Sequence, residues 1–384
     1  MRMGIRSLGP SLLAAATLVL TACADTGNPT TSFSPTPPAS APTSRPSAST
    51  SAPSPSETTV TCDAAMRVAL ITDVGGIDDM GYSQSAYEGM EAAAAAAPTC
   101  FETAYLEITG PPDYETHLAE LTGAGYDVII GVGLLASDPL GDAAERSPDT
   151  TFIAVDTIPT SGHNDSWNTN GQSLFFAEDQ AGYLAGVLAA SLSESNHIGV
   201  VGSFITLPPV ERFVEGYASG AKDTRPAIDV DVVYTNSLGD PLQGRNAATH
   251  LISQGADVMF TAGGLTGTGA QTANGALLAA CAAGVWAIGA ETDLFLTLKE
   301  ARPCLVSSAT KNVTGAVRDA LLRFARGDFE PGIHVDDAST NGIGLAPFRD
   351  HEPLVPDDVR ALLQDTLAGL ADGSIEPDVT IDSS

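Results

Sequence analysis

Short apolar runs rich in β-branched residues alternate with helix-forming stretches along the chain after residue 61, and this alternation limits the possible folds most strongly. We expect strands at 67–71, 127–132, 151–155, 197–201, 230–234, 257–261, 285–288 and 305–308. We expect helices between them at 85–97, 179–192, 209–222, 244–254 and 269–283. Near-continuous apolar strands that alternate with helices indicate an α/β fold whose parallel sheets are covered on both faces. Such sheets bind ligands at the carboxyl ends of their strands.

The length of the folded part predicts two lobes rather than one. About 320 residues follow residue 61, which is too many for one small core. We expect an N-terminal lobe of residues 62–165 plus 300–326 and a C-terminal lobe of residues 166–299 plus 327–384. The chain would cross between the lobes near 157–180, 289–304 and 324–335.

The first 23 residues have the pattern of a lipoprotein signal peptide. Arg2 and Arg6 precede an apolar stretch at 12–20, which is too short to span a bilayer as a stable anchor. Small residues then precede Cys23, as in the bacterial lipobox, where the cysteine becomes the lipid-bearing mature N-terminus. The alternative is an ordinary signal peptide with a chance cysteine. We expect a protein anchored by lipid to the extracytoplasmic face of the cell membrane.

Residues 24–61 are predicted to be a linker. They consist mainly of Ser, Thr, Pro and Ala, with hardly a large apolar side chain to bury. A proline-rich chain stays extended, so this linker would let the folded part stand away from the membrane.

The charge of the chain excludes two classes of partner. The 17 basic and 47 acidic residues give a formal net charge of −30, which argues against nucleic acid and anionic membrane surfaces. Solubility is the simplest explanation of this charge.

Four cysteines remain for disulfides if Cys23 carries lipid, an even number in an oxidising compartment. Cys62 and Cys100 each precede a predicted strand, and Cys281 and Cys304 likewise flank strand starts. Because strand starts share one edge of a parallel sheet, we expect the pairs Cys62–Cys100 and Cys281–Cys304. No Cys-x-x-Cys spacing is present, so we expect no zinc site, and we expect no cofactor.

Polar residues follow the first strand, where a ligand would bind. Asp73 should point into the crevice, while Tyr82 and Ser83 lie at the start of the next helix, near its free backbone amides. For Asp78 and Asp79, a turn with solvated carboxylates is an equally good interpretation. Ser85 and Glu88 have the spacing of a capping box for that helix.

This stretch resembles the opening motif of the Basic Membrane Protein family, the purine-nucleoside-receptor type of ABC-importer lipoprotein. Further blocks similar to the family follow in order over nearly all of the chain after the linker. They are residues 152–156, 181–186, 202, 209–210, 213–217, 239–241, 255–260, 263–264, 288–293 and 307–311.

The resemblance implies roles for four residues of the N-terminal part. Asp73 has the place of an aspartate that hydrogen-bonds the base, and Asp156 matches a ligand contact near the hinge. The family has a Phe-Asn pair where this chain has Tyr82 and Ser83. Tyr82 keeps a ring for stacking, whereas Ser83 lacks the amide that reads the base.

The resemblance also implies contacts from the C-terminal part. Leu238 stands where the family has a second aromatic ring. The ribose hydroxyls would be held by Gly264, Lys311 and Glu291, the last replacing an aspartate, with Asp293 as the alternative. A buried lysine needs a partner, and Glu291 or Asp156 could pair with Lys311.

The resemblance implies a periplasmic-binding-protein fold of type I, with two lobes joined by about three crossovers. Such a protein captures a small polar solute by closure of its lobes and passes it to the permease and ATPase subunits of an ABC importer. A nucleoside is the leading candidate, and a modified base or sugar-like solute is the alternative. We expect a monomer without catalytic activity or catalytic residues.

Parts of the sequence also suggest three other functions. A nucleoside hydrolase would need an aspartate two places before Asp73, where this chain has Ile71. A nucleotide-binding enzyme is suggested by the glycines of 264–269, but the P-loop lysine is missing. A ligand-sensing lipoprotein that signals through a partner would use the same two lobes, and the sequence leaves it open.

Overall fold

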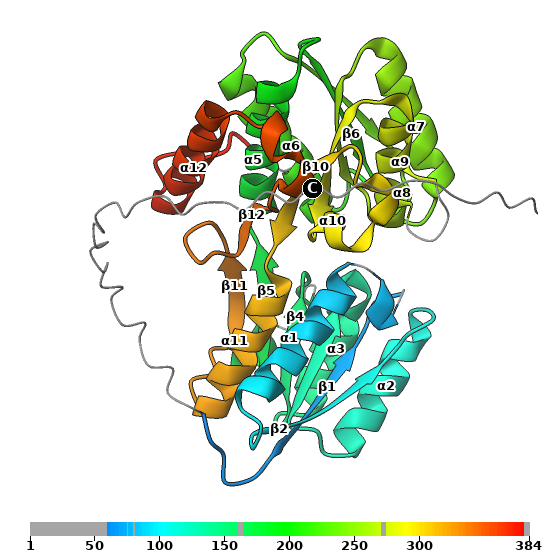
Figure 1. Ribbon diagram of the computed structural model, residues 1–384. Coiled ribbons are helices and arrows are strands. Elements are labelled where there is room, and N and C mark those ends of the chain that lie inside the picture. The colour runs from blue at the N-terminus through cyan, green and yellow to red at the C-terminus, as the bar shows by residue number, and fades with distance from the viewer. Residues whose placement is uncertain (1–59, 75, 80, 160–163, 270–273, 380–384) are drawn as a thin grey trace, which may run out of the picture. The chain divides into compact units, whose positions relative to one another are not determined.

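The eight expected strands, together with four strands that the sequence analysis does not predict, form two six-stranded sheets, each with its own covering helices (Figure 1). The structure is a computed structural model that describes residues 60–74, 76–79, 81–159, 164–269 and 274–379. These residues belong to one compact unit, Glu57–Ser384. The expected signal peptide, Cys23 and nearly all of the expected linker at 24–61 lie outside the described residues.

The first sheet is entirely parallel, with the order β11-β5-β4-β3-β1-β2. Alternate residues of a strand face opposite sides of a sheet, and both sides are buried here. Val68 and Leu70 lie in one buried cluster, whereas Ala69 and Ile71 lie in another. The strands are β1 (Met66–Ile71), β2 (Phe101–Leu106), β3 (Val128–Val132), β4 (Thr151–Val155), β5 (Gly171–Phe176) and β11 (Gly332–Asp336).

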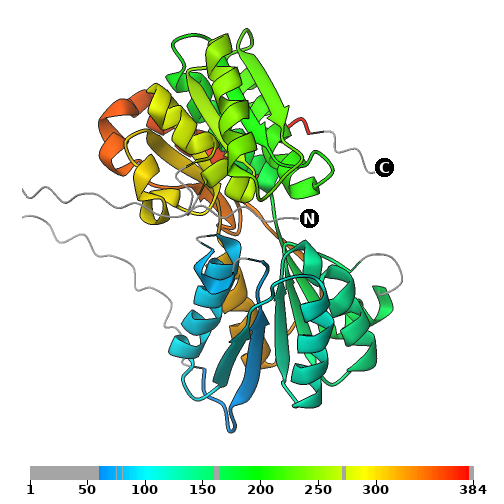
Figure 2. The same cartoon turned by 90° about the vertical axis from the view of Figure 1, so that its right-hand side faces the viewer.

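Helices cover both faces of this sheet (Figures 1 and 2). On one face α1 (Tyr82–Ala96) lies beside α11 (Val313–Arg326), and both pack on the strands. The other face is covered by α2 (Pro112–Gly123), α3 (Ser137–Arg146) and α4 (Asn164–Asn170). The short turns η1 (Gly76–Asp78) and η2 (Leu134–Ala136) follow β1 and β3.

The second sheet has the order β12-β10-β9-β8-β6-β7 and is parallel except for β12, which pairs antiparallel with β10. Its strands are β6 (His197–Gly202), β7 (Asp229–Tyr234), β8 (Val258–Ala262), β9 (Trp286–Glu291), β10 (Leu305–Lys311) and β12 (Ile343–Leu345). Its helices are α5 (Glu178–Leu192), α6 (Pro208–Thr224), α7 (Pro241–Gln254), α8 (Gly264–Thr268), α9 (Ala276–Ala283), α10 (Leu294–Thr297), η3 (Lys299–Ala301), η4 (Arg349–Leu354) and α12 (Asp357–Asp372).

Glycines allow α5 and α6 to approach at backbone distance. A Cβ atom added to Gly186 would lie 2.0 Å from Tyr217 O, and one added to Gly216 would lie 2.1 Å from Asp179 O. Gly182 and Gly220 meet the facing backbone in the same way. No residue with a side chain fits at these positions without moving the helices apart.

The expected boundaries between the lobes are wrong in three places. β5 and β11, expected in the C-terminal lobe, complete the first sheet, and β10, expected in the N-terminal lobe, lies in the second. Among the described residues, the chain passes between the sheets at residue 177, at residue 312 and within 337–342. Only the expected crossover at 157–180 contains one of these. Apolar periodicity marks a strand but does not indicate which sheet it joins.

Two disulfides fix strand starts at the amino edge of each sheet. Cys62 is bonded to Cys100 beside the paired strands β1 and β2. Cys281 is bonded to Cys304 beside β9 and β10. These are the two pairings that the sequence predicts.

Candidate functional site

Asp73 and Tyr82 form a hydrogen-bonded pair at the carboxyl edge of the first sheet. The Tyr82 hydroxyl donates to Asp73 Oδ2 over 2.8 Å, and Val74 N donates to Asp73 Oδ1 over 2.7 Å. Burial raises the pKa of Asp73 above its ordinary value, although the two hydrogen bonds act in the opposite direction. Burial and the charge of Asp73 raise the pKa of Tyr82 well above its ordinary value, so the phenol keeps its proton.

Ser83 supports Asp73 from within the protein. Its side chain is fully buried, and its hydroxyl accepts a hydrogen bond from Asp73 N over 3.1 Å. The hydroxyl therefore points into the protein in this structure, whereas the sequence expectation placed Ser83 in contact with a ligand. The reason is that the first turn of α1 turns this hydroxyl toward the end of β1.

Asp79 caps the helix that carries Tyr82. Its carboxylate accepts from Gly81 N at 2.7 Å, Ser83 N at 3.0 Å and Gln84 N at 3.1 Å. A carboxylate at this position satisfies free amides of the first turn and interacts favourably with the helix dipole. The expected capping box of Ser85 and Glu88 is therefore wrong, because α1 begins three residues earlier, at Tyr82.

Gly133 provides the space for the Asp73–Tyr82 pair. It follows β3 with φ of +82°, and an added Cβ atom would lie 2.3 Å from Asp73 Oδ2 and 2.9 Å from the Tyr82 hydroxyl. The buried Tyr114 hydroxyl lies within hydrogen-bond distance of Thr72 O and Val132 O, 2.9 and 2.6 Å away. Tyr114 therefore holds the ends of β1 and β3 together beneath the pair.

Lys311 lies at the centre of a buried ionic cluster. Its ammonium contacts Asp156 after β4, Glu291 at the end of β9 (2.9 Å) and Glu178 at the start of α5 (3.3 Å). Arg212 Nε donates to the other oxygen of Glu178 over 2.7 Å. The ammonium also lies 5.6 and 5.7 Å from two phenylalanine ring centroids, close enough for a cation–π contribution.

The charges of this cluster are strongly coupled. Burial, the largest single influence, lowers the pKa of Lys311, but the combined charges of the three carboxylates raise it above its ordinary value. Burial raises the pKa of Glu178 to about 7 and that of Glu291 in the same direction, while Lys311 opposes both shifts. Asp156 Oδ1 is buried and has no hydrogen-bond partner among the described residues. This oxygen can accept a hydrogen bond from a bound molecule.

Thr266 holds the loop after β7 against α8. Thr266 N donates to Leu238 O over 3.1 Å, and its hydroxyl lies 2.8 Å from Ser237 O and 3.0 Å from Asp240 N. Gly264 begins α8, and a Cβ atom added there would lie 3.4 Å from Leu238 Cδ2. The Leu238 side chain is 45% exposed. Leu238 and Gly264 therefore lie side by side at the edge of the second sheet.

The structure places the expected site residues in separate groups, among them the Asp73–Tyr82 pair and the Lys311 cluster. Asp156 and Glu291 add to the rise in the pKa of Tyr82, so the first-sheet pair and the Lys311 cluster are close enough to interact electrostatically. Asp293, the alternative to Glu291, instead forms an ion pair with Arg349.

Sequence reasoning missed Glu178, Arg212, Gly133 and Thr266. Gly133 gave a positional signal, because it follows a predicted strand, whereas Glu178 gave none, because the strand at Gly171–Phe176 was not predicted. Nothing in the sequence indicated Arg212 or Thr266.

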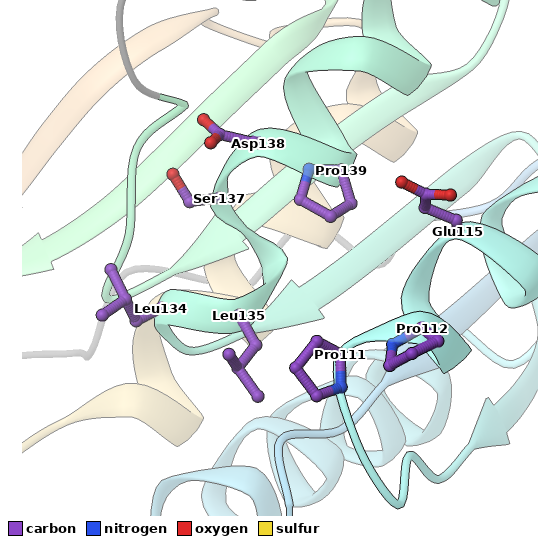
Figure 3. Close-up of a pocket in the computed structure, with 8 residues that line it drawn as sticks. All are labelled: Pro111, Pro112, Glu115, Leu134, Leu135, Ser137, Asp138 and Pro139. Carbon is purple, nitrogen blue, oxygen red and sulfur yellow. The ribbon is translucent and has the colours of Figure 1, made fainter.

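A separate groove lies beside the carboxyl end of β3. Its volume is about 570 Å³, and Figure 3 shows the prolines and leucines that line it together with three polar residues. None of the expected site residues lines it. The lining residues are Pro111, Pro112, Glu115, Leu134, Leu135, Ser137, Asp138 and Pro139.

The sequence from residue 66 to residue 367 matches the Bmp family, described as ABC transporter substrate-binding protein PnrA-like. The chain belongs to this family. Bmp proteins are substrate-binding proteins of ABC transporters rather than enzymes, and they work with the permease and ATPase components of those transporters. The match confirms the family that the sequence motifs indicate.

Curated relatives in the Bmp family support this assignment. A CD4+ T-cell-stimulating antigen of Listeria monocytogenes is 30% identical over 321 residues, covering 80% of this chain and 87% of that protein. The ABC transporter nucleoside-binding protein BmpA of Lactococcus lactis is 31% identical over 232 residues, covering 59% and 64%. An uncharacterized lipoprotein of Pyrococcus abyssi is 29% identical, covering 73% and 68%.

Solved structures show the same fold. A solute-binding protein of an ABC transporter system from Aeropyrum pernix K1 has a TM-score of 0.69 at 21% identity, covering 83% of this chain and 94% of that chain. One from Conexibacter woesei has a TM-score of 0.66 at 23% identity, covering 82% and 99%. These similarities confirm the type I fold of periplasmic solute-binding proteins. Within the described part of the chain, no helix is long and apolar enough to cross a membrane.

Proposed function

We propose that this Bmp protein captures a nucleoside at the carboxyl ends of its strands and delivers it to an ABC importer. The observation that carries the proposal is the Asp73–Tyr82 pair, a partly buried acceptor beside an aromatic ring, set near the Lys311 cluster. The Lactococcus lactis relative, named as a nucleoside-binding protein, supports the same ligand class.

In this proposal the first sheet binds the base. The ring of Tyr82 stacks on the planar base, which contributes about 0.5–1.5 kcal/mol beyond surface burial. Asp73 accepts a hydrogen bond from a ring N–H or amine, and its partial burial strengthens the interaction. Leu238 covers the base from the second sheet with apolar contact.

The ribose lies against the Lys311 cluster. Asp156 Oδ1 has no partner among the described residues, so it accepts a hydrogen bond from one ribose hydroxyl. Glu291 and Lys311 engage the neighbouring hydroxyl, and Gly264 approaches through its backbone. A buried polar group without a hydrogen-bond partner is unfavourable. Ribose hydroxyls that supply the missing partners therefore favour the bound state.

Binding and closure are linked in this mechanism. The base site belongs to the first sheet, whereas Glu291 and Gly264 belong to the second. A ligand that contacts both is bound more tightly when the lobes are closed, so it shifts the population toward the closed form. The importer would recognise that form. Lipid on Cys23 would keep the protein at the extracytoplasmic face of the membrane.

Isothermal titration of the unit Glu57–Ser384 with nucleosides, free bases and pentoses tests the ligand class. We expect a dissociation constant in the micromolar range or tighter for at least one nucleoside, weakened at least about 100-fold by Asp73→Ala. Heat with sugars alone, or equal binding by Asp73→Ala, would refute the proposal.

A second experiment tests the lipid anchor. Cys23→Ser should move the protein from the membrane fraction to the soluble fraction.

A further inference from the structure

Arg212 reaches the Lys311 cluster from α6, a helix that carries none of the expected ligand contacts. It lies near the start of that helix, and its Nε donates to Glu178 Oε2 over 2.7 Å. The other oxygen of Glu178 accepts from Lys311 Nζ over 3.3 Å. One fully buried carboxylate therefore joins the guanidinium of Arg212 to the ammonium of Lys311.

The close approach of α5 and α6 places Arg212 on Glu178. A Cβ atom added to Gly216, one helical turn after Arg212, would lie 2.1 Å from the carbonyl oxygen of Asp179, the residue after Glu178. A Cβ atom added to Gly182 would lie 2.3 Å from the carbonyl oxygen of the residue after Arg212. Backbone contacts in both directions thus fix the two side chains relative to each other.

The ammonium lies between one inner carboxylate and two outer ones. The Glu178 side chain is 0% exposed, whereas those of Asp156 and Glu291 are 8% and 30% exposed. A solute can therefore reach the outer two and not Glu178. Both outer residues have left-handed backbone, with φ of +59° for Asp156 and +76° for Glu291. This conformation is unfavourable for a residue with a Cβ atom and persists only where neighbouring contacts hold it.

The inner carboxylate affects how strongly the outer ones can accept hydrogen bonds. With Glu178 ionised, the cluster holds three carboxylates and two cations, so one negative charge is in excess. Glu178 then holds the ammonium toward the interior, and the outer carboxylates accept from a solute as charged groups. Without Glu178, Asp156 and Glu291 alone would share the ammonium, which would neutralise them more fully.

Arg212 favours the ionised form of Glu178. Burial raises the pKa of Glu178 to about 7, whereas the charge of Lys311 and the charge and hydrogen bond of Arg212 lower it. Apolar side chains of similar volume often stabilise a fold as well as a buried ion pair does. Stability alone therefore does not explain an arginine at this position.

We infer that Arg212 is a positioning residue for solute capture and that it acts through Glu178 on the Lys311 ammonium. It holds the ammonium on the inner side of the cluster, which leaves Asp156 and Glu291 as acceptors for a solute. This inference rests on the proposed function, in which the ribose hydroxyls meet those two carboxylates. Loss of the Arg212 charge should weaken the binding of the hydroxyls and leave the contacts of the base unchanged.

The test compares the tightest-binding nucleoside with its 2′,3′-dideoxy analogue, which has the same base but lacks the 2′ and 3′ hydroxyls. Isothermal titration at pH 8, above the pKa of Glu178, gives both affinities, with displacement of the nucleoside for the weaker analogue. We expect Arg212→Met to reduce the ratio of the two affinities about five- to tenfold, the effect of one hydrogen bond. Arg212→Lys keeps the charge and should retain most of the ratio.

Lys222→Met is the matched control, because Lys222 is an exposed cation on the same helix. It should leave the ratio unchanged. If Arg212→Met does not fold, Glu178→Gln tests the same chain of contacts and should lower the ratio in the same way. An unchanged ratio in Glu178→Gln would overturn the inference.

A measurement without ligand tests the route through Glu178. The chain has three lysines, Lys222, Lys299 and Lys311, so ¹⁵N NMR of lysine-labelled protein can follow the buried ammonium. We expect its Nζ signal to titrate with Glu178 near pH 7, and Arg212→Met to move this titration to higher pH. An unmoved titration, or an equal loss of affinity for nucleoside and analogue, would overturn this inference alone. Binding of no nucleoside by the wild type would overturn the proposed function and this inference with it.

Discussion

Lys311 and Asp156 form an ion pair that joins the two sheets. Lys311 ends β10 in the second sheet, and Asp156 directly follows β4 in the first. Glu178, another partner of the ammonium, begins α5 directly after the crossing at residue 177. The chain crosses back at residue 312. The cluster thus lies beside two of the three crossings between the sheets in the described part of the chain, where closure of the lobes would turn.

Removal of the Lys311 ammonium should destabilise the protein strongly. Lys311→Met leaves three carboxylates with one remaining cation, Arg212, and breaking a buried pair costs about 3–5 kcal/mol. We expect the urea midpoint to fall accordingly. Lys222→Met, on the exposed surface of α6, is the control and should change the midpoint little. Equal midpoints for the two variants would contradict a central role of Lys311.

Glu178 should make stability depend on pH. Its pKa in the folded protein is raised from 4.5 to about 7, so between these values the folded state holds the proton more tightly. The stabilisation of the folded state by the protonated Glu178 carboxyl is fully present below about pH 4.5, and it is lost as the pH rises through about 7. Glu178→Gln resembles the protonated acid and removes this dependence. The free energy of unfolding of the variant, relative to the wild type, should therefore increase from pH 5 to pH 8.

Urea unfolding at several pH values measures this difference, and the change across the range should be on the order of 3 kcal/mol at most. Titrating groups outside the Lys311 cluster cancel because variant and wild type share them. The exposed Glu300→Gln serves as the control and should show a constant difference. A constant difference for Glu178→Gln as well would show that Glu178 does not titrate in this window.

Gly133→Ala should weaken nucleoside binding through two effects. Alanine at positive φ costs roughly 1–2 kcal/mol, and its Cβ atom would also displace Asp73 and Tyr82. Gly125→Ala has the same backbone cost at φ of +72°, with no atom within 4 Å of the added Cβ. We expect both variants to lose stability, but only Gly133→Ala to lose affinity, by about tenfold or more. Parallel loss of affinity in both would point to a backbone effect alone.

Each disulfide should contribute measurably to stability. The pairs Cys62–Cys100 and Cys281–Cys304 close loops of 38 and 23 residues. Loop-closure entropy then predicts about 4 and about 3 kcal/mol. Alanine replacement of both cysteines in each pair, followed by urea unfolding, measures these values. A larger loss for the second pair would show that strain or residual structure outweighs loop length.

Much of the fold could be predicted from the sequence because strand and helix signals are local. The apolar runs predicted strands such as β3 and β8. The positions of the strand starts predicted which cysteines pair. Membership of β5, β10 and β11 in a sheet depends on long-range packing. The residues of a strand alone offer no local signal for that choice.

The positions of candidate site residues at strand ends were predictable where a residue type and a predicted strand end coincide, as for Asp73, Asp156 and Lys311. The sequence could not show that the Ser83 side chain points into the protein or that the Tyr82 hydroxyl donates a hydrogen bond to Asp73. Both depend on where α1 begins, which Asp79 sets by capping. Arg212 joins the cluster only through the glycine-mediated approach of α5 and α6.

A crystal structure of the protein with its tightest-binding nucleoside tests the central claim most directly. We expect the base to lie against the ring of Tyr82, with a donor within hydrogen-bond distance of Asp73 and a ribose hydroxyl at Asp156 Oδ1. Density for the nucleoside in the groove between Pro111 and Pro139 (Figure 3), with Asp73 and Lys311 uncontacted, would contradict it.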